Sequence, residues 1–242
     1  MNAQRFASVA VLVFAFSMVF EAREMRSQEA KTRYPHMAPI EEYLMMDRNA
    51  EIALARSAAP ESISHDATVL VLGRRGYETA VEGKNGFECA VERGWMSPAD
   101  APEFWNPKVR RPICFNPPAA RSVLPTTYKR TEMVLAGRTK AEIIDANKAA
   151  FERGELPVLE PGAMSYMMSK QAYLTDDDDH NWAQLIFYAP PLDSAVWGAD
   201  LPKSPLILNP QFKGVQPIDV LIVPVGWWSD GTPAPVMWGS FI

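Results

Sequence analysis

The densest group of ionisable side chains in the chain is the run from Asp176 to Asp179 followed by His180. Carboxylates are the ligands that Ca²⁺ and Mg²⁺ prefer, and a neighbouring imidazole adds Zn²⁺ and Mn²⁺. The spacing of a calcium-binding loop is absent, and four consecutive aspartates cannot all point into one site. The sequence therefore predicts either a solvated acidic turn or a divalent-metal site formed by Asp176, Asp178 and His180.

Histidine is scarce, since only His36, His65 and His180 occur. A serine hydrolase would need His65 or His180 as its base, and no Gly-x-Ser-x-Gly motif supplies the nucleophile. We therefore expect no serine-hydrolase chemistry. The enzyme class that stays open is a metal-assisted hydrolase centred on the segment 176–180, with His65 as a further candidate base. The only cofactor it would need is the divalent metal.

Glutamates alternate with apolar residues along two neighbouring segments, 77–82 and 87–92. We predict that a three-residue loop at 84–86 joins these segments as a hairpin, which places Val81 opposite Cys89 and gathers the glutamates on the other face. These glutamates are Glu78, Glu82, Glu88 and Glu92. Like charges on adjacent strands are unfavourable unless cations balance them. We expect a solvated face, and a face that binds a cation or a partner is the alternative.

The two cysteines, Cys89 and Cys114, are separated by 25 residues. In an oxidising compartment an even pair predicts a disulfide, which would contribute about 3 kcal/mol by restricting the unfolded chain. Two buried free thiols are the alternative, because Cys89 also fits the apolar face of a strand.

The first thirty residues have the layout of an export signal. Arg5 is the only charge before the apolar run 6–20. As a helix this run would be about 22 Å long, which is shorter than the roughly 30 Å of a bilayer core. We therefore predict that residues 1–30 are a signal peptide, that the mature protein is secreted or periplasmic, and that it has no stable membrane span. An uncleaved anchor is the alternative.

The composition is that of a globular protein: 48% of the residues are hydrophobic and 22% are charged, with a formal net charge of −5. An acidic chain lacks the clustered lysines and arginines that bind phosphate backbones, so we expect no nucleic-acid partner.

Two helices are predicted from apolar periodicity and capping. The first spans 39–58 and ends before Pro60. The second spans 140–153 and begins with a capping box formed by Thr139 and Glu142.

Strands are expected at 68–72, 77–81, 87–91, 126–136, 163–170, 183–188 and 218–225. Seven prolines in 95–125 predict a long irregular, proline-rich loop. Because strands and helices do not alternate regularly, residues 31–242 are predicted to form a single α+β domain with a mainly antiparallel sheet.

Three segments carry a family resemblance: TVLVLGRRGYETAVEGKNGFECAVERGW, WGADLPKSP and VPVGWWSDGT. In these segments the chain resembles an uncharacterised group of exported bacterial proteins with no assigned chemistry. The resemblance implies export and a shared fold, and it supplies no catalytic residue. The leading hypothesis is a non-catalytic domain that binds a small ligand or a protein partner through the face covered by residues 95–125.

Overall fold

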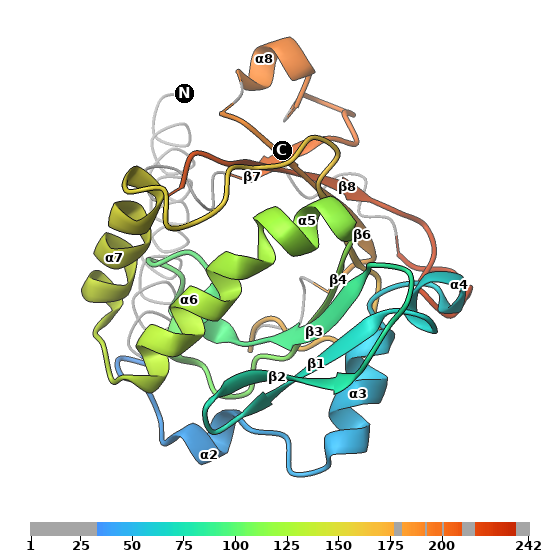
Figure 1. The fold of residues 1–242 in the computed structure, drawn as a ribbon. Helices are drawn as coiled ribbons and strands as arrows, with labels where there is room; N and C mark the ends of the chain where they lie inside the picture. The colour runs from blue at the N-terminus through green and yellow to red at the C-terminus, as the bar shows by residue number, and fades with distance from the viewer. Residues whose placement is uncertain (1–32, 177–180, 192, 200, 210–215, 236–242) are drawn as a thin grey trace, which may run out of the picture.

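The computed structural model describes residues 33–176, 181–191, 193–199, 201–209 and 216–235. The predicted signal peptide, together with Asp178 and His180, lies outside these residues. The described residues form one curved sheet with helices on both of its faces (Figure 1). The strands are β1 (Thr68–Gly73), β2 (Gly76–Val81), β3 (Glu88–Glu92), β4 (Arg111–Phe115), β5 (Met164–Met167), β6 (Gln184–Ala189), β7 (Ile207–Asn209) and β8 (Asp219–Pro224).

The strand order is β2-β1-β3-β4-β5-β6-β8-β7. Every neighbouring pair is antiparallel except β1 and β3, which are parallel. The prediction of an α+β fold with a mainly antiparallel sheet is therefore confirmed.

The predicted hairpin between the second and third strands is wrong. Strand β2 pairs with β1, and β3 pairs with the opposite edge of β1, where Val69 lies beside Cys89. The connection between β2 and β3 passes close to the start of β1: a Cβ atom on Gly83 would lie 2.1 Å from the backbone nitrogen of Thr68. The continuous apolar run in β1 explains the difference, because a strand that is apolar on both faces favours a central position.

Alternation along the central strands separates two apolar layers. Cys89, Val91 and Cys114 face one side, where they pack with Leu54 and Ala55 of helix α3 (Arg48–Arg56). The residues between them face helices α5 (Pro117–Ser122) and α6 (Leu124–Leu135) on the other side. Both faces of the sheet are thus covered.

The predicted helix at 39–58 is split in two. Helix α2 covers Ile40–Tyr43, and α3 begins after Asp47, whose side chain accepts hydrogen bonds from the backbone nitrogens of Asn49 and Ala50. The second predicted helix is confirmed as α7 (Lys140–Glu152), with its capping box formed. The short helices are α4 (Glu61–Ser64) and α8 (Ser194–Trp197), with 3-10 turns at Gly94–Met96 and Pro102–Trp105.

Two predictions for the region after residue 94 are wrong. The proline-rich segment is not one irregular loop, because it contains the central strand β4, and Pro117 and Pro118 occupy the first turn of α5. The predicted strand at 126–136 is helical. Its buried residues recur at three- and four-residue steps, which is the spacing of one helix face. They include Leu124, Thr127, Thr131 and Val134.

Within the described ranges, no helix has the length and hydropathy needed to cross a membrane.

Candidate functional site

A cavity of about 140 Å³ lies between the sheet and the α5–α6 side of the molecule. Alternate side chains of β4, β6 and β8 line it, together with Glu92 at the end of β3. Residues at the junction of α5 and α6 supply the opposite wall. Its apolar lining includes Ile113, Phe115, Val123, Ile186, Val220 and Ile222. The rest of the lining is mainly polar and includes Glu92, Arg111, Thr127, Tyr188 and Asn209. A cavity that combines an apolar wall with convergent polar groups can hold a small molecule.

Glu92 is the acidic group of this cavity. The residue is 5% exposed, and Thr127 on α6 donates its hydroxyl hydrogen to Glu92 Oε1 at 2.8 Å. Burial raises the pKa of Glu92 above its ordinary value, while Arg111, the Thr127 hydrogen bond and Arg130 oppose that rise. The carboxyl group therefore takes up a proton at a higher pH than an exposed glutamate does.

Two arginines flank Glu92. Arg111 lies directly across from it on β4 and donates from Nη2 to Ser97 Oγ at 2.8 Å. Arg130 on α6 is buried and donates from Nη1 to the backbone oxygens of Trp95 and Ser97 at 3.2 and 3.3 Å. Burial lowers the pKa of Arg111, and it lowers that of Arg130 to about 10. Because arginine side chains keep their proton in proteins, both guanidinium groups are cationic at neutral pH.

Three further polar side chains in the cavity wall each have an atom without a hydrogen-bond partner among the described residues. These atoms are Thr126 Oγ1, Gln184 Oε1 and Gln216 Nε2, and each of the three residues is at most 6% exposed. A buried polar atom left without a partner costs about 1–3 kcal/mol, so such atoms usually meet a water molecule or a ligand. Their position in one cavity makes it the candidate binding site.

The predicted acidic site is described only at Asp176. Its carboxylate accepts hydrogen bonds from Arg33 Nη1 (2.9 Å), Tyr34 Oη (2.7 Å), Lys108 Nζ (3.1 Å) and Tyr173 Oη. Burial would raise the pKa of Asp176, but these four donors together hold it well below its usual range. Asp176 thus joins three segments of the chain.

The metal hypothesis is left with one of its three residues in the described part of the chain, since Asp178 and His180 lie outside it. Both the metal site and the acidic turn therefore stay predictions. Within the ranges that the structure describes, no group of three His, Cys, Asp or Glu side chains is arranged to hold a metal ion.

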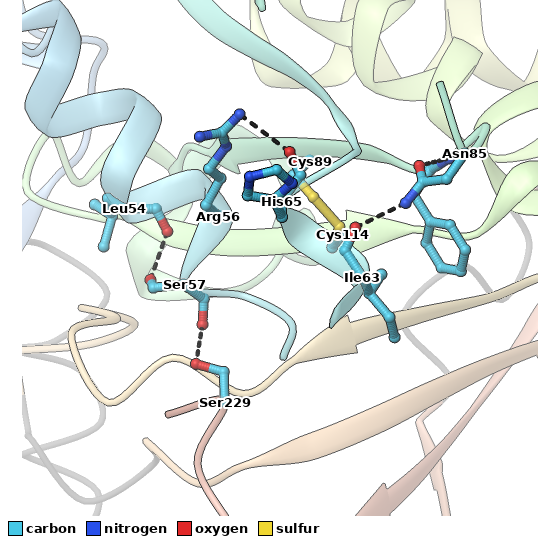
Figure 2. Close-up of a disulfide and its surroundings, with 10 residues drawn as sticks. Leu54, Arg56, Ser57, Ile63, His65, Asn85, Cys89, Cys114 and Ser229 are labelled. Atoms are coloured by element: carbon cyan, nitrogen blue, oxygen red, sulfur yellow. Dashed lines mark hydrogen bonds between the residues drawn. A yellow bond between two sulfur atoms is a disulfide. The ribbon is translucent and has the colours of Figure 1, made fainter. Parts of the chain in front are cut away.

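His65 lies at the end of α4, on the surface of the molecule (Figure 2). Its Nδ1 is 2.9 Å from Asp66 Oδ1, and the two side chains are 70% and 38% exposed. The hydrogen bond to His65, with help from Lys84, lowers the pKa of Asp66. A histidine–aspartate pair on an open surface lacks the enclosed site that catalysis needs, so His65 does not support the hydrolase hypothesis.

The predicted disulfide between Cys89 and Cys114 is confirmed. The two residues lie opposite each other on β3 and β4, both are fully buried, and they face α3 (Figure 2). The bond therefore lies on the side of the sheet away from the cavity. It joins the two strands that carry Glu92 and Arg111.

The predicted solvated face of four glutamates is wrong in one important respect. Glu78 is exposed on β2 and pairs with Arg48 at 2.5 Å, as a solvated residue would. Glu92, however, is buried under α6. The sequence pattern placed Glu92 on the face opposite Cys89, but nothing in the pattern indicated that a helix covers that face.

Comparisons with known proteins give no indication of function, so a function has to be inferred from the cavity. No protein-family model, curated protein or solved structure matches the chain. The resemblance to exported bacterial proteins therefore stays a prediction.

Proposed function

We propose that the protein is a binding domain for a small amphipathic organic molecule, which it holds in the cavity between the sheet and helices α5 and α6. The observation that carries the proposal is the set of unpaired polar atoms on Thr126, Gln184 and Gln216, all of which line one cavity whose wall is part apolar and part polar. A bound molecule would supply their missing hydrogen bonds and would cover the apolar wall.

The size of the cavity limits the ligand. At about 140 Å³ it is close to the roughly 150 Å³ of an engineered cavity that binds benzene. A ligand of one ring with a polar substituent fits this volume, whereas a nucleotide or an oligosaccharide does not. The proposal includes a secreted or periplasmic location, which the buried disulfide supports because such bonds persist in oxidising compartments.

Titration with benzamide tests the proposal. Benzamide combines one ring with a neutral group that donates and accepts hydrogen bonds, and toluene is the matched probe without that group. We expect saturable binding of benzamide with a dissociation constant at or below about 1 mM, and weaker binding of toluene. Two-dimensional NMR of the full chain would show whether the perturbed amides belong to β4, β6 and α6.

Two neighbouring residues of β6 offer a matched pair of variants. Ile186 points into the cavity, and Phe187 points away from it and is 40% exposed. Ile186→Trp fills the cavity and should abolish benzamide binding, whereas Phe187→Trp should leave it unchanged. Val123→Phe fills the cavity from the opposite wall, and it replaces Ile186→Trp as the test variant if Ile186→Trp does not fold. Absence of saturable binding of benzamide, and of its charged single-ring analogues benzoate and benzylamine, at tenfold the expected dissociation constant would refute the proposal.

A further inference from the structure

The polar end of the cavity has the donors that recognise a carboxylate. Arg111 lines the cavity, and its hydrogen bond to Ser97 uses one nitrogen of a guanidinium group that carries five N–H donors. A guanidinium group binds a carboxylate through two parallel hydrogen bonds. Gln216 Nε2 is an unpaired donor in the same wall, and the Thr126 hydroxyl can donate as well.

When Glu92 is protonated, the buried charged groups around it carry a net positive charge that one bound anion would balance. The charged groups around Glu92 are Arg111 on β4 and Arg130 on α6, and Glu103 on the 3-10 turn interacts with Arg111. Thr127, Tyr188 and Tyr77 on β2 are further polar groups that interact with Glu92. Two arginines and two glutamates balance when both glutamates are ionised. Protonation of Glu92 leaves one surplus positive charge beside an apolar cavity.

We propose that the ligand of this cavity is a small monocarboxylate, whose carboxylate is held by Arg111 and whose apolar part lies against Ile113, Phe115 and Ile222. The inference rests on the proposed function and specifies the chemical class of its ligand. Glu92 takes up a proton when the ligand binds, because the protonated side chain no longer repels the ligand and can itself donate a hydrogen bond. Gln184 Oε1 is an acceptor and takes its hydrogen from water or from a ligand hydroxyl group.

Three probes with the same ring test this inference: benzoate, benzamide and benzylamine. They differ only in a substituent that is anionic, neutral or cationic. With the full chain on the acid side of the Glu92 titration, we expect benzoate to bind at least about tenfold more tightly than benzamide and benzylamine to bind most weakly. As pH rises through the pKa of Glu92, isothermal titration calorimetry in two buffers of different ionisation enthalpy should also show that benzoate binding takes up protons.

Variants assign the roles of the two side chains. Arg111→Gln should reduce benzoate affinity to that of benzamide, and Arg111→Lys should cause a smaller loss because it keeps the charge without the paired donors. Arg121→Gln removes an exposed arginine, which pairs with Glu160, and should leave benzoate binding unchanged. Glu92→Gln imitates the protonated side chain, so it should bind benzoate with little dependence on pH.

The direction of the pH effect follows from the charges. Benzoate stays ionised between about pH 5.5 and about pH 8, because its carboxylic acid is as strong as an ordinary side-chain carboxyl group. Wild-type affinity for benzoate should therefore fall as pH rises through the pKa of Glu92, while benzamide affinity should change little.

The outcomes separate the inference from the proposed function. If benzamide or benzylamine binds in the cavity and benzoate binds no more tightly than benzamide, the carboxylate inference is wrong and the binding function stands. Benzoate affinity that is unchanged in Arg111→Gln also contradicts the inference. If none of the three probes binds, both proposals fail.

Discussion

The hydroxyl group of Thr127 donates a 2.8 Å hydrogen bond to Glu92 Oε1, which joins helix α6 to strand β3 inside the molecule. Its neighbour Thr126 is equally buried, at 2% exposure against 1% for Thr127, but Thr126 Oγ1 has no partner among the described residues. One buried threonine therefore stabilises a carboxyl group, and the next presents its oxygen to the cavity.

The two threonines make a matched test of that difference. Thr127→Val removes the donor to a buried carboxyl group and should lower the free energy of unfolding by about 1–3 kcal/mol. Thr126→Val removes an unpaired polar atom and should change stability little or increase it. Urea unfolding of the two variants measures both effects. An equal loss in the two variants would show that the Glu92 contact contributes nothing.

Glu92 should give the protein an unusual dependence of stability on pH. Because burial raises its pKa in the folded state, its contribution is fully present below the unfolded value of about 4.3 and is lost as pH rises through the folded value. Glu92→Gln should therefore gain stability relative to wild type as pH increases. Urea unfolding across that pH range measures the difference between the two proteins.

Glu142 provides a control of opposite sign for this experiment. The backbone N–H and the hydroxyl group of Thr139 lower its pKa. Glu142→Gln should therefore lose stability relative to wild type as pH rises toward the unfolded value of about 4.3, and the difference should stay constant above it. A Glu92→Gln curve parallel to that of wild type would contradict the assignment of a raised pKa to Glu92.

The contribution of Asp176 to stability should have the pH dependence that is usual for a carboxylate in an ion pair. Its pKa is lowered, so its contribution is present above the unfolded value of about 3.9 and is lost as pH falls toward the folded value. Asp176→Asn should be less stable than wild type at neutral pH, and the gap should narrow in acid. Asp145→Asn, on the exposed side of α7, is the control, and an equal effect of the two changes would mean that the four donors of Asp176 add nothing.

Much of the fold was predictable because local signals agreed with the tertiary structure. The capping box of Thr139 and Glu142 fixes the start of α7, and the alternation through Cys89 and Val91 assigns their faces correctly. The partner strand of β2 was not predictable, because alternation states which side chains share a face but not which neighbour they meet. Helix α6 was missed because its three threonines favour a strand locally, and packing against the sheet outweighs that preference.

The cavity could not be found from the sequence, because its polar residues are far apart along the chain. Glu92 appears as the polar member of an alternating strand, and it is buried only because α6 covers that face. Gln184 and Gln216 belong to no motif. The acidic run at 176–180 was the stronger local signal, yet the part of it that the structure describes, Asp176, binds arginine, lysine and tyrosine side chains.

The disulfide should stabilise the fold without forming part of the binding site. Cys89→Ala with Cys114→Ala removes a link that closes a loop of 25 residues, which should lower the free energy of unfolding by about 3 kcal/mol. The double variant should still bind benzamide under conditions where it is folded, because the two sulfurs face α3. Mass spectrometry with and without reduction verifies the bond in the wild type, and loss of benzamide binding by the folded variant would contradict the separation of the two faces.

The buried ion pair between Glu51 and Arg93 should be the most sensitive polar contact in the described structure. Arg93 Nη2 lies 2.8 Å from Glu51 Oε1, the two side chains are 0% and 2% exposed, and Glu51 also accepts from the backbone nitrogen of Leu72. Arg93→Met leaves a buried carboxylate without its cation and should lower the free energy of unfolding by about 3–5 kcal/mol. Urea unfolding measures the loss.

A second change separates loss of the charge from loss of the contact. Glu51→Leu combined with Arg93→Met removes both charges and should recover a substantial part of the stability, because the cost of the single change comes mainly from the carboxylate left unpaired. Arg121→Met breaks the exposed pair with Glu160 and should cost at most about 1 kcal/mol, since water screens both partners. If Arg93→Met cost no more than Arg121→Met, water would have to reach Glu51 in the folded protein, and the packing of α3 against β1 and β3 would be looser than its buried contacts indicate.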